Sequence, residues 1–229
     1  MNKTTATIIT VNETNFLYFL NHPEEIGEDF VIENTDAITV MLSNRELDPA
    51  QLEKWKNHCS GMSIMLDTLY YKHNNILGLA KNEYEGLKAA LPLHDIGKAL
   101  MPELFSFAGV FSKFQKAAKE FHAIVGAKYL EKHPKLLGTH KKITLRVIKE
   151  HHSVSKYFPS QVIKALDVFQ SLMANDATRS YQDPEIAKKA KKIVFEFEKG
   201  LHNEKIMNIL FALYEKGELP VVMQDEVHA

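Results

Sequence analysis

Histidine and aspartate residues occupy the positions of this sequence that are best suited to chemistry. His94 and Asp95 are adjacent, and they offer an imidazole and a carboxylate, both of which bind transition metals. The carboxylate can in addition bridge two metal ions, which a neutral imidazole cannot. His122 follows in a helical stretch, and the tandem pair His151-His152 ends another. Together these residue types and positions favour a metal site.

Two further residues fit the same site. Asp167 lies in an otherwise apolar helical stretch, residues 162–169. Burying a carboxylate there costs several kcal/mol unless the group is paired or bound to a cation. His58 lies in the first long helical stretch. Because helical bundles build metal sites from side chains on facing helices, we expect these residues to converge.

The composition is that of a folded protein and excludes several functional classes. The chain has 229 residues, a net charge of -1 and 45% hydrophobic residues. Only three of its 28 basic residues are arginine, the residue preferred for phosphate and guanine contacts, so we expect no DNA or RNA binding. A single cysteine, Cys59, cannot form an internal disulfide, which indicates a cytoplasmic location. The apolar run at the N-terminus is too short for a membrane span, so we expect no membrane association.

The elements that must position these residues fall into two parts. Residues 1–47 contain β-branched runs and predict a small α/β appendage. From Asp48 to residue 229 the apolar spacing is close to 3.6 residues and predicts a mostly α-helical domain. The expected helices span residues 48–71, 82–93, 112–133, 139–152, 160–173, 184–198 and 203–214.

The order of these motifs resembles the HD superfamily of metal-dependent phosphohydrolases. The matching segments are Leu93-His94-Asp95-Ile96-Gly97-Lys98, His122-x-x-x-Gly126, His151-His152 and Asp167-Val168-Phe169. Within the superfamily, their spacing is similar to the HD-GYP subfamily, whose members are bacterial cyclic di-GMP phosphodiesterases with two or three metals, usually iron or manganese. The resemblance covers residues 48–217 and implies an HD helical bundle over residues 48–229.

The resemblance also implies a role for each site residue. One metal would be held by His58, His94, Asp95 and Asp167, and a second by the bridging Asp95 with His122, His151 and His152. Iron or manganese is expected, while zinc, magnesium and nickel stay open. The two metals would activate a water as hydroxide for attack on phosphorus. Asp95 and Lys98 would be catalytic, and Lys98, Arg179 and Tyr181 would contact a cyclic dinucleotide or other phosphoester.

Three departures from the subfamily pattern affect function. The loop after the histidine pair reads Tyr157-Phe158-Pro159 and lacks the glycine of the Gly-Tyr-Pro motif. Lys54 stands where three-metal members have a glutamate, with Glu53 off that face of the helix, so we expect two metals. Gln170 stands where a second aspartate is usual. These changes leave the metal site intact and the substrate open.

Two other interpretations compete with a phosphodiesterase. A metal-stabilised regulatory module could bind a nucleotide or a partner without turnover, and an HD scaffold also supports di-iron oxygenase chemistry. Residues 1–47 could be a truncated sensory domain, a lid, or an element for homodimerisation or for contact with a signalling partner.

Overall fold

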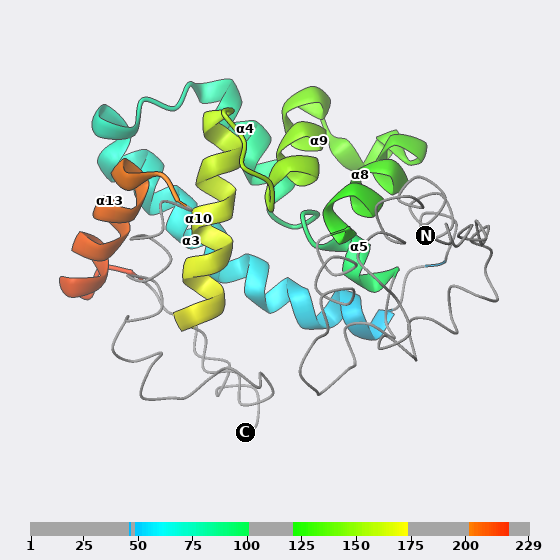
Figure 1. The fold of residues 1–229 in the computed structure, drawn as a ribbon, viewed down its shortest axis with the longest axis horizontal. Helices are drawn as coiled ribbons and strands as arrows, with labels where there is room; N and C mark the ends of the chain where they lie inside the picture. The colour runs from blue at the N-terminus through cyan, green and yellow to red at the C-terminus, as the bar shows by residue number, and fades with distance from the viewer. Residues whose placement is uncertain (1–45, 47–48, 101–120, 174–201, 220–229) are drawn as a thin grey trace, which may run out of the picture.

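The computed structural model describes residue 46 and residues 49–100, 121–173 and 202–219, with the backbone alone for 49–55, 57, 172–173 and 215 (Figure 1). This part of the chain is mostly helical, as expected, and contains no strand. None of its helices combines the length and the apolar character that crossing a membrane requires. The elements are α3 (Pro49–Leu77), α4 (Lys81–Ala90), α5 (Ile96–Ala99), α8 (His122–Lys132), η2 (Pro134–Leu137), α9 (Lys141–Glu150), α10 (Phe158–Met173) and α13 (Glu204–Glu215).

The helix positions expected from the apolar spacing are confirmed where the structure describes them, and their ends differ. α3 continues to Leu77, six residues beyond the expected end. The helix expected over 82–93 ends at Ala90, and after a turn the chain starts α5, which the sequence did not predict. The segments 1–45, 112–120 and 184–198, including the expected strands, lie outside the described residues.

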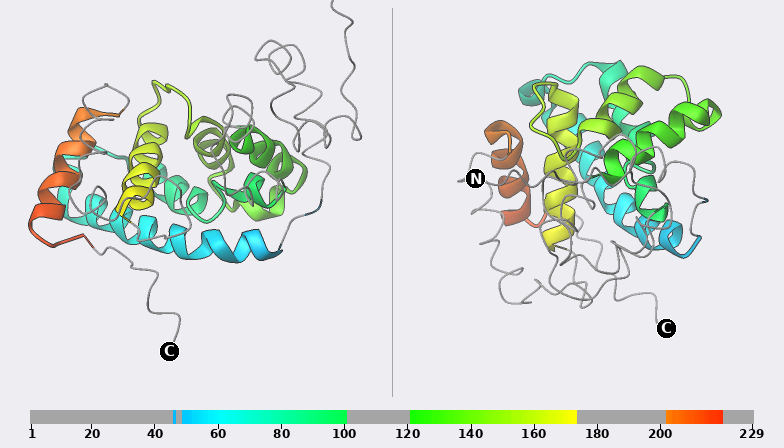
Figure 2. Two further views of the ribbon diagram at one scale, coloured as in Figure 1. Left: turned by 60° about the horizontal axis from the view of Figure 1, so that its bottom comes forward. Right: turned by 45° about the vertical axis from the view of Figure 1, so that its right-hand side comes forward.

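Helix α3 is the axis along which the other helices pack (Figures 1 and 2). It contacts α4, α5, α10 and α13. Its core face consists of Met62, Met65, Leu66 and Leu69, all at most 1% exposed. This spacing is the one that the sequence predicted. Burying each of these side chains contributes about 1.5–3 kcal/mol, which places α3 at the centre of the core.

A polar and aromatic cluster holds α4 against α3. The rings of Tyr70 and Tyr84 stack with centroids 3.9 Å apart. The Tyr84 hydroxyl donates a hydrogen bond of 2.7 Å to Asp67 Oδ1, and Lys88 Nζ lies 2.8 Å from Asp67 Oδ2. Because the turn after α4 contains His94 and Asp95, this cluster also holds in place the backbone that carries these two residues.

Helices α5 and α8 meet backbone to backbone. A Cβ atom added to Gly97 would collide with the carbonyl oxygen of His122 and lie 3.0 Å from the amide nitrogen of Gly126. A Cβ added to Gly126 would lie 3.1 Å from the nitrogen of Gly97. The two glycines therefore set the separation between Asp95, just before α5, and His122, the first residue of α8.

We expect Gly97→Ala to destabilise the protein by about 3 kcal/mol, at the upper end of the usual cost of overpacking, because the new methyl group meets rigid backbone. Urea unfolding followed by circular dichroism measures this. Gly217→Ala, at the end of α13, is the matched control, since nothing lies within 4 Å of its Cβ position and its cost of about 1 kcal/mol comes from its positive φ of 66°. Equal losses in the two variants would show that the α5–α8 contact is not tightly packed.

Candidate metal centre

The turn between α4 and α5 delivers His94 and Asp95 to the interior. Both side chains are at most 1% exposed. Asp95 occupies the N-cap position of α5, yet its carboxylate makes no capping hydrogen bond. It points instead to imidazoles, with Oδ1 2.9 Å from His122 Nε2 and 3.8 Å from His151 Nε2. An aspartate at an N-cap usually satisfies backbone amides, so this orientation serves the site and not the helix.

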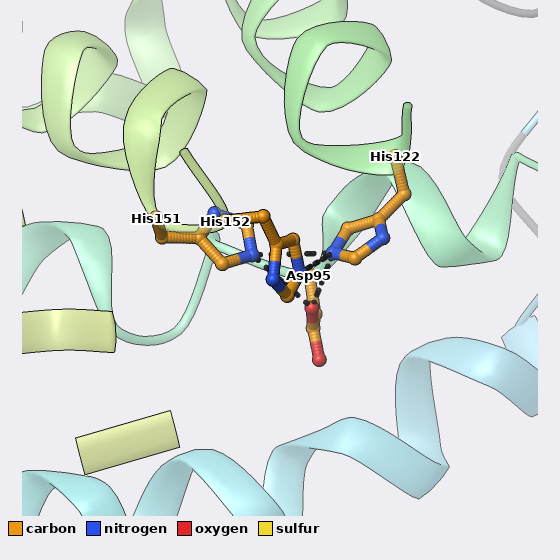
Figure 3. A group of neighbouring side chains, drawn as sticks. All are labelled: Asp95, His122, His151 and His152. Carbon is orange, nitrogen blue, oxygen red and sulfur yellow. Dashed lines mark hydrogen bonds and ion pairs between the residues drawn. The ribbon is translucent and has the colours of Figure 1, made fainter. Parts of the chain in front are cut away.

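Three imidazoles from the ends of α8 and α9 converge above Asp95 (Figure 3). His122 starts α8, and His151 and His152 follow α9. His122 Nε2 lies 3.2 Å from His151 Nε2 and 3.1 Å from His152 Nε2. Neighbouring nitrogens that all face one point form the geometry in which imidazoles surround a cation.

His58 and Asp167 form a second pair of possible ligands close to His94. His58 on α3 places Nε2 3.0 Å from Oδ1 of Asp167 on α10. The same carboxylate oxygen lies 3.9 Å from His94 Nε2. The structure therefore brings all seven of the expected metal ligands into one cluster, buried except for the half-buried His152, although they come from α3, α8, α10 and the segments next to α5 and α9.

Backbone carbonyls define the tautomers of two histidines. The Nδ1 of His94 lies 2.8 Å from the carbonyl oxygen of Leu91, and the Nδ1 of His151 lies 2.6 Å from that of Ile148. A carbonyl oxygen only accepts, so each Nδ1 donates its hydrogen, and each ring in its neutral form presents a lone pair on Nε2. Metal-binding histidines are commonly oriented in this way.

Electrostatics keep the imidazoles after α9 neutral. Burial, reinforced by the neighbouring His152 and His122, holds the pKa of His151 well below its ordinary value. Burial and then His122 lower the pKa of His152 to about 3. Because a histidine must lose its proton before it can bind a metal, both rings are in the required form near neutral pH.

The carboxylates stay ionised for a different reason. Burial alone would raise the pKa of Asp95, but His94 and Lys98 outweigh it and hold that pKa well below the ordinary value. Burial would also raise the pKa of Asp167, and the hydrogen bond from His58 reverses the effect. Burial opposes a charge on His94, yet the adjacent Asp95 raises the pKa of His94 well above its usual value. The centre of the cluster therefore attracts positive charge.

Two buried atoms test whether a metal would fit. His94 Nε2 and Asp95 Oδ1 have no hydrogen-bond partner in the part of the chain that the structure describes, although His122 Nε2 lies close to that oxygen. An unpaired buried polar atom is costly, and a cation would satisfy both. Three groups of side chains have ligand atoms close enough to share an ion: Asp95 with His122, His151 and His152; His58 with His94 and Asp95; and His94 with His151 and Asp167.

A helical bundle that gathers imidazoles and carboxylates around a buried aspartate defines a class of metal-binding helical domains. Comparison with protein families identifies which family of such domains this is. The model of the HD domain matches residues 57–172, slightly more than half of the chain, so the protein belongs to the HD-domain family. HD domains are generally metal-dependent phosphohydrolases. Searches of curated proteins and of solved structures found no match.

The other expected site residues have different outcomes. Lys98 lies at the edge of the cluster and forms an ion pair with Oδ2 of Asp95. Gln170, which stands where a second aspartate is usual, is buried against Gly61. Arg179 and Tyr181, proposed for substrate binding, lie outside the described residues, as do the side chains of Glu53 and Lys54.

Sequence reasoning missed the residue that holds the loop after the histidine pair. Glu150, directly before His151, accepts hydrogen bonds from Ser155 Oγ at 2.5 Å and Ser160 Oγ at 2.9 Å, and its other oxygen lies 3.0 Å from Arg146 Nε. The Arg146 guanidinium also lies 4.1 Å from the centroid of the Tyr157 ring. The sequence signal that could have indicated this was a glutamate directly before the histidine pair, with Ser155 and Ser160 shortly after it.

The Tyr-Phe-Pro segment is therefore not a free loop. Phe158 is the first residue of α10 and Pro159 lies in its first turn, two residues earlier than the sequence suggested. Proline is tolerated there because first-turn amides have no partner within the helix. Val154, at the tip of the connection, is 94% exposed. The connection is thus short and anchored at both ends.

We expect Glu150→Gln to lower the free energy of unfolding by about 1–3 kcal/mol near pH 7, because it weakens charge-assisted hydrogen bonds. Burial would raise the pKa of Glu150, but bonds from Ser155, Ser160 and Arg146 hold it below the usual 4.5. A lowered pKa in the folded state gives stability that is complete above the unfolded pKa and is lost as pH falls through the folded pKa.

The difference between wild type and Glu150→Gln should therefore shrink as the pH falls from about 5 to about 3. Urea unfolding at several pH values measures it, and titrations common to both proteins cancel in the difference. Glu131→Gln, an exposed glutamate on α8, serves as the control. A difference that stays constant with pH would show that the Glu150 charge does not hold this loop.

Proposed function

We propose that this HD-domain protein is a two-metal phosphodiesterase of the HD-GYP type that hydrolyses cyclic di-GMP or a related cyclic dinucleotide. The observation that supports it is the convergence of seven imidazole and carboxylate side chains on a buried centre with unpaired ligand atoms at His94 and Asp95. The ordered motifs that resemble the HD-GYP subfamily support the choice of substrate.

The position of Asp95 supports a site with two metals. This residue belongs to two of the three ligand groups, one with His122 and the pair after α9, the other with His58 and His94. A carboxylate has two oxygens and can serve one ion with each, whereas each imidazole presents one lone pair here. Asp95 as a bridge between two metals accounts for both groups. Oxygen and nitrogen ligands of this kind suit iron or manganese.

The chain's own residues would prepare the reaction. Two adjacent divalent metals would supply an activated water and neutralise charge on the phosphate. The carbonyls of Leu91 and Ile148 hold the rings of His94 and His151 in the orientation that ligation needs. Burial of the cluster strengthens each electrostatic interaction within it. A separate general base from the protein is not needed.

Lys98 is the residue we propose for phosphate contact. Its ammonium pairs with Asp95 Oδ2, so it lies directly beside the proposed metals, and its side chain is 21% exposed. A substrate phosphate that reaches the metals would therefore meet this ammonium from the accessible side. The positive charge would stabilise the additional negative charge that develops during hydrolysis.

We expect Asp95→Asn to lose bound metal and to reduce cyclic di-GMP turnover by at least about 100-fold, because it removes the shared ligand charge. Protein purified without oxygen and loaded with Fe(II) or Mn(II) would be analysed for metal content, and product would be followed by chromatography. Asp67→Asn is the matched control, since that carboxylate belongs to the α3–α4 cluster.

Metal content and turnover separate the alternatives. Wild-type protein that binds two metals and yields linear or mononucleotide product supports the phosphodiesterase. Two bound metals without turnover would reject cyclic di-GMP as substrate and favour the regulatory module, for which the anchored Tyr-Phe-Pro segment is the supporting observation. Wild-type protein that binds no metal would reject the metal centre itself.

We expect Lys98→Met to retain its metals and to lose about 100-fold or more in kcat/KM, because a donor to the reacting phosphate is removed. Lys98→Arg should recover part of the activity, since it keeps the charge. Lys72→Met, on the exposed side of α3, is the control. Loss of metal together with activity in Lys98→Met would show that Lys98 acts by orienting Asp95 and not by contacting substrate.

A further inference from the structure

Three neighbouring elements of the protein, α8, η2 and α9, carry a strong positive charge that the near-neutral total conceals. Between residues 128 and 149 the sequence has seven basic residues and one acidic residue, whereas the whole chain has a net charge of -1. These basic residues lie on α8, η2 and α9, which pack against one another. We call them the basic face: Lys128, Lys132, Lys135, Lys141, Lys142, Arg146 and Lys149, all exposed except the half-buried Lys128.

The charge of the basic face is only partly compensated. Arg146 pairs with Glu150. Among the described residues, none forms an ion pair with Lys135, Lys141 or Lys142, all of which lie near the turn between α8 and α9. Helix α9 also begins without an acidic residue in its first turn and without a side-chain cap. Two lysines at the positive end of a helix dipole are unfavourable alone and favour an anionic neighbour.

The same chain contains a segment of opposite charge. Residues 24–36 have six acidic residues and no lysine or arginine. The segment also contains apolar residues, among them Ile26 and Phe30. Leu136, in η2 between the lysines, exposes 49% of its surface. The basic face thus offers both charge and apolar surface that complement residues 24–36.

A connection of twelve residues tethers the segment to α3, which packs against α5, and α5 in turn packs against α8. The connection comprises residues 37–48, and an extended chain of this length spans about 40 Å. The N-terminal end of α3 lies on the same side of the molecule as α5 and α8 (Figures 1 and 2). Tethering gives the segment an effective concentration of about 1 mM or more, which favours it over a separate partner.

We propose that residues 24–36 dock on the basic face of the same chain. Nucleic acid is a weaker candidate, because only one of the seven basic residues is arginine. This contact lies outside the proposed metal centre and does not depend on the proposed reaction. It assigns a role to the N-terminal region as a partner of α8, η2 and α9.

Carbodiimide cross-linking of the full chain tests the proposal, because it joins contacting carboxylates and lysines without a spacer. At low salt we expect cross-links from residues 24–36 to Lys135, identified by peptide mass spectrometry. Roughly 1 M NaCl shortens the Debye length to about 3 Å and should abolish them.

Lys141→Gln with Lys142→Gln should reduce the Lys135 links about twofold to fivefold, as expected for loss of exposed ion pairs. Lys72→Gln with Lys81→Gln is the matched control.

Three outcomes would overturn the proposal. Links from residues 24–36 to lysines outside the basic face would place the segment elsewhere, and no salt-sensitive link would show that it does not dock. In a mixture of ¹⁵N-labelled and unlabelled protein, links only between labelled and unlabelled chains would make a second copy the occupant. Binding of a single-stranded oligonucleotide that is lost in Lys141→Gln with Lys142→Gln, without any segment link, would make nucleic acid the ligand.

Discussion

The buried charge of Asp95 is the constraint on which the rest of this structure depends. Its side chain is 1% exposed, and a carboxylate without water or a partner would cost several kcal/mol. The fold compensates with the Lys98 ammonium on one oxygen and imidazoles around the other. Asp95 Oδ1 still has no hydrogen-bond partner among the described residues, and a cation at this point would satisfy it. The bundle is thus arranged to bind positive charge at this point.

No single segment can satisfy this constraint, so the site depends on tertiary structure. Its seven residues are contributed by separate helices or by the turns beside them, and α3 is the axis that holds several of these elements together. The contact between Gly97 and the backbone of His122 sets the distance across the centre. When ligands come from so many elements, metal binding and folding are coupled, because an ion bound at this cluster would stabilise only the assembled bundle.

The extent to which the sequence predicted this arrangement has a physical explanation. Long helices and the convergence of His94, Asp95 and Asp167 could be predicted, because apolar periodicity and a lone carboxylate in an apolar stretch are local signals. The turn before α5 and the hydrogen bonds from Ser155 and Ser160 to Glu150 were missed, because each depends on residues that become neighbours only after folding. Substrate contacts proposed for Arg179 and Tyr181 remain predictions.

The distribution of charge connects the metal centre to the outer surface. Helices α8 and α9 provide His122 and His151 at one end, and both carry residues of the basic face. Like charges on two packed helices repel each other, and an anion bound between them would relieve that repulsion. If residues 24–36 occupy the face, they stabilise the packing that holds the two imidazoles together. By linkage, metal binding and segment docking would then favour each other, because both select the same arrangement of two helices.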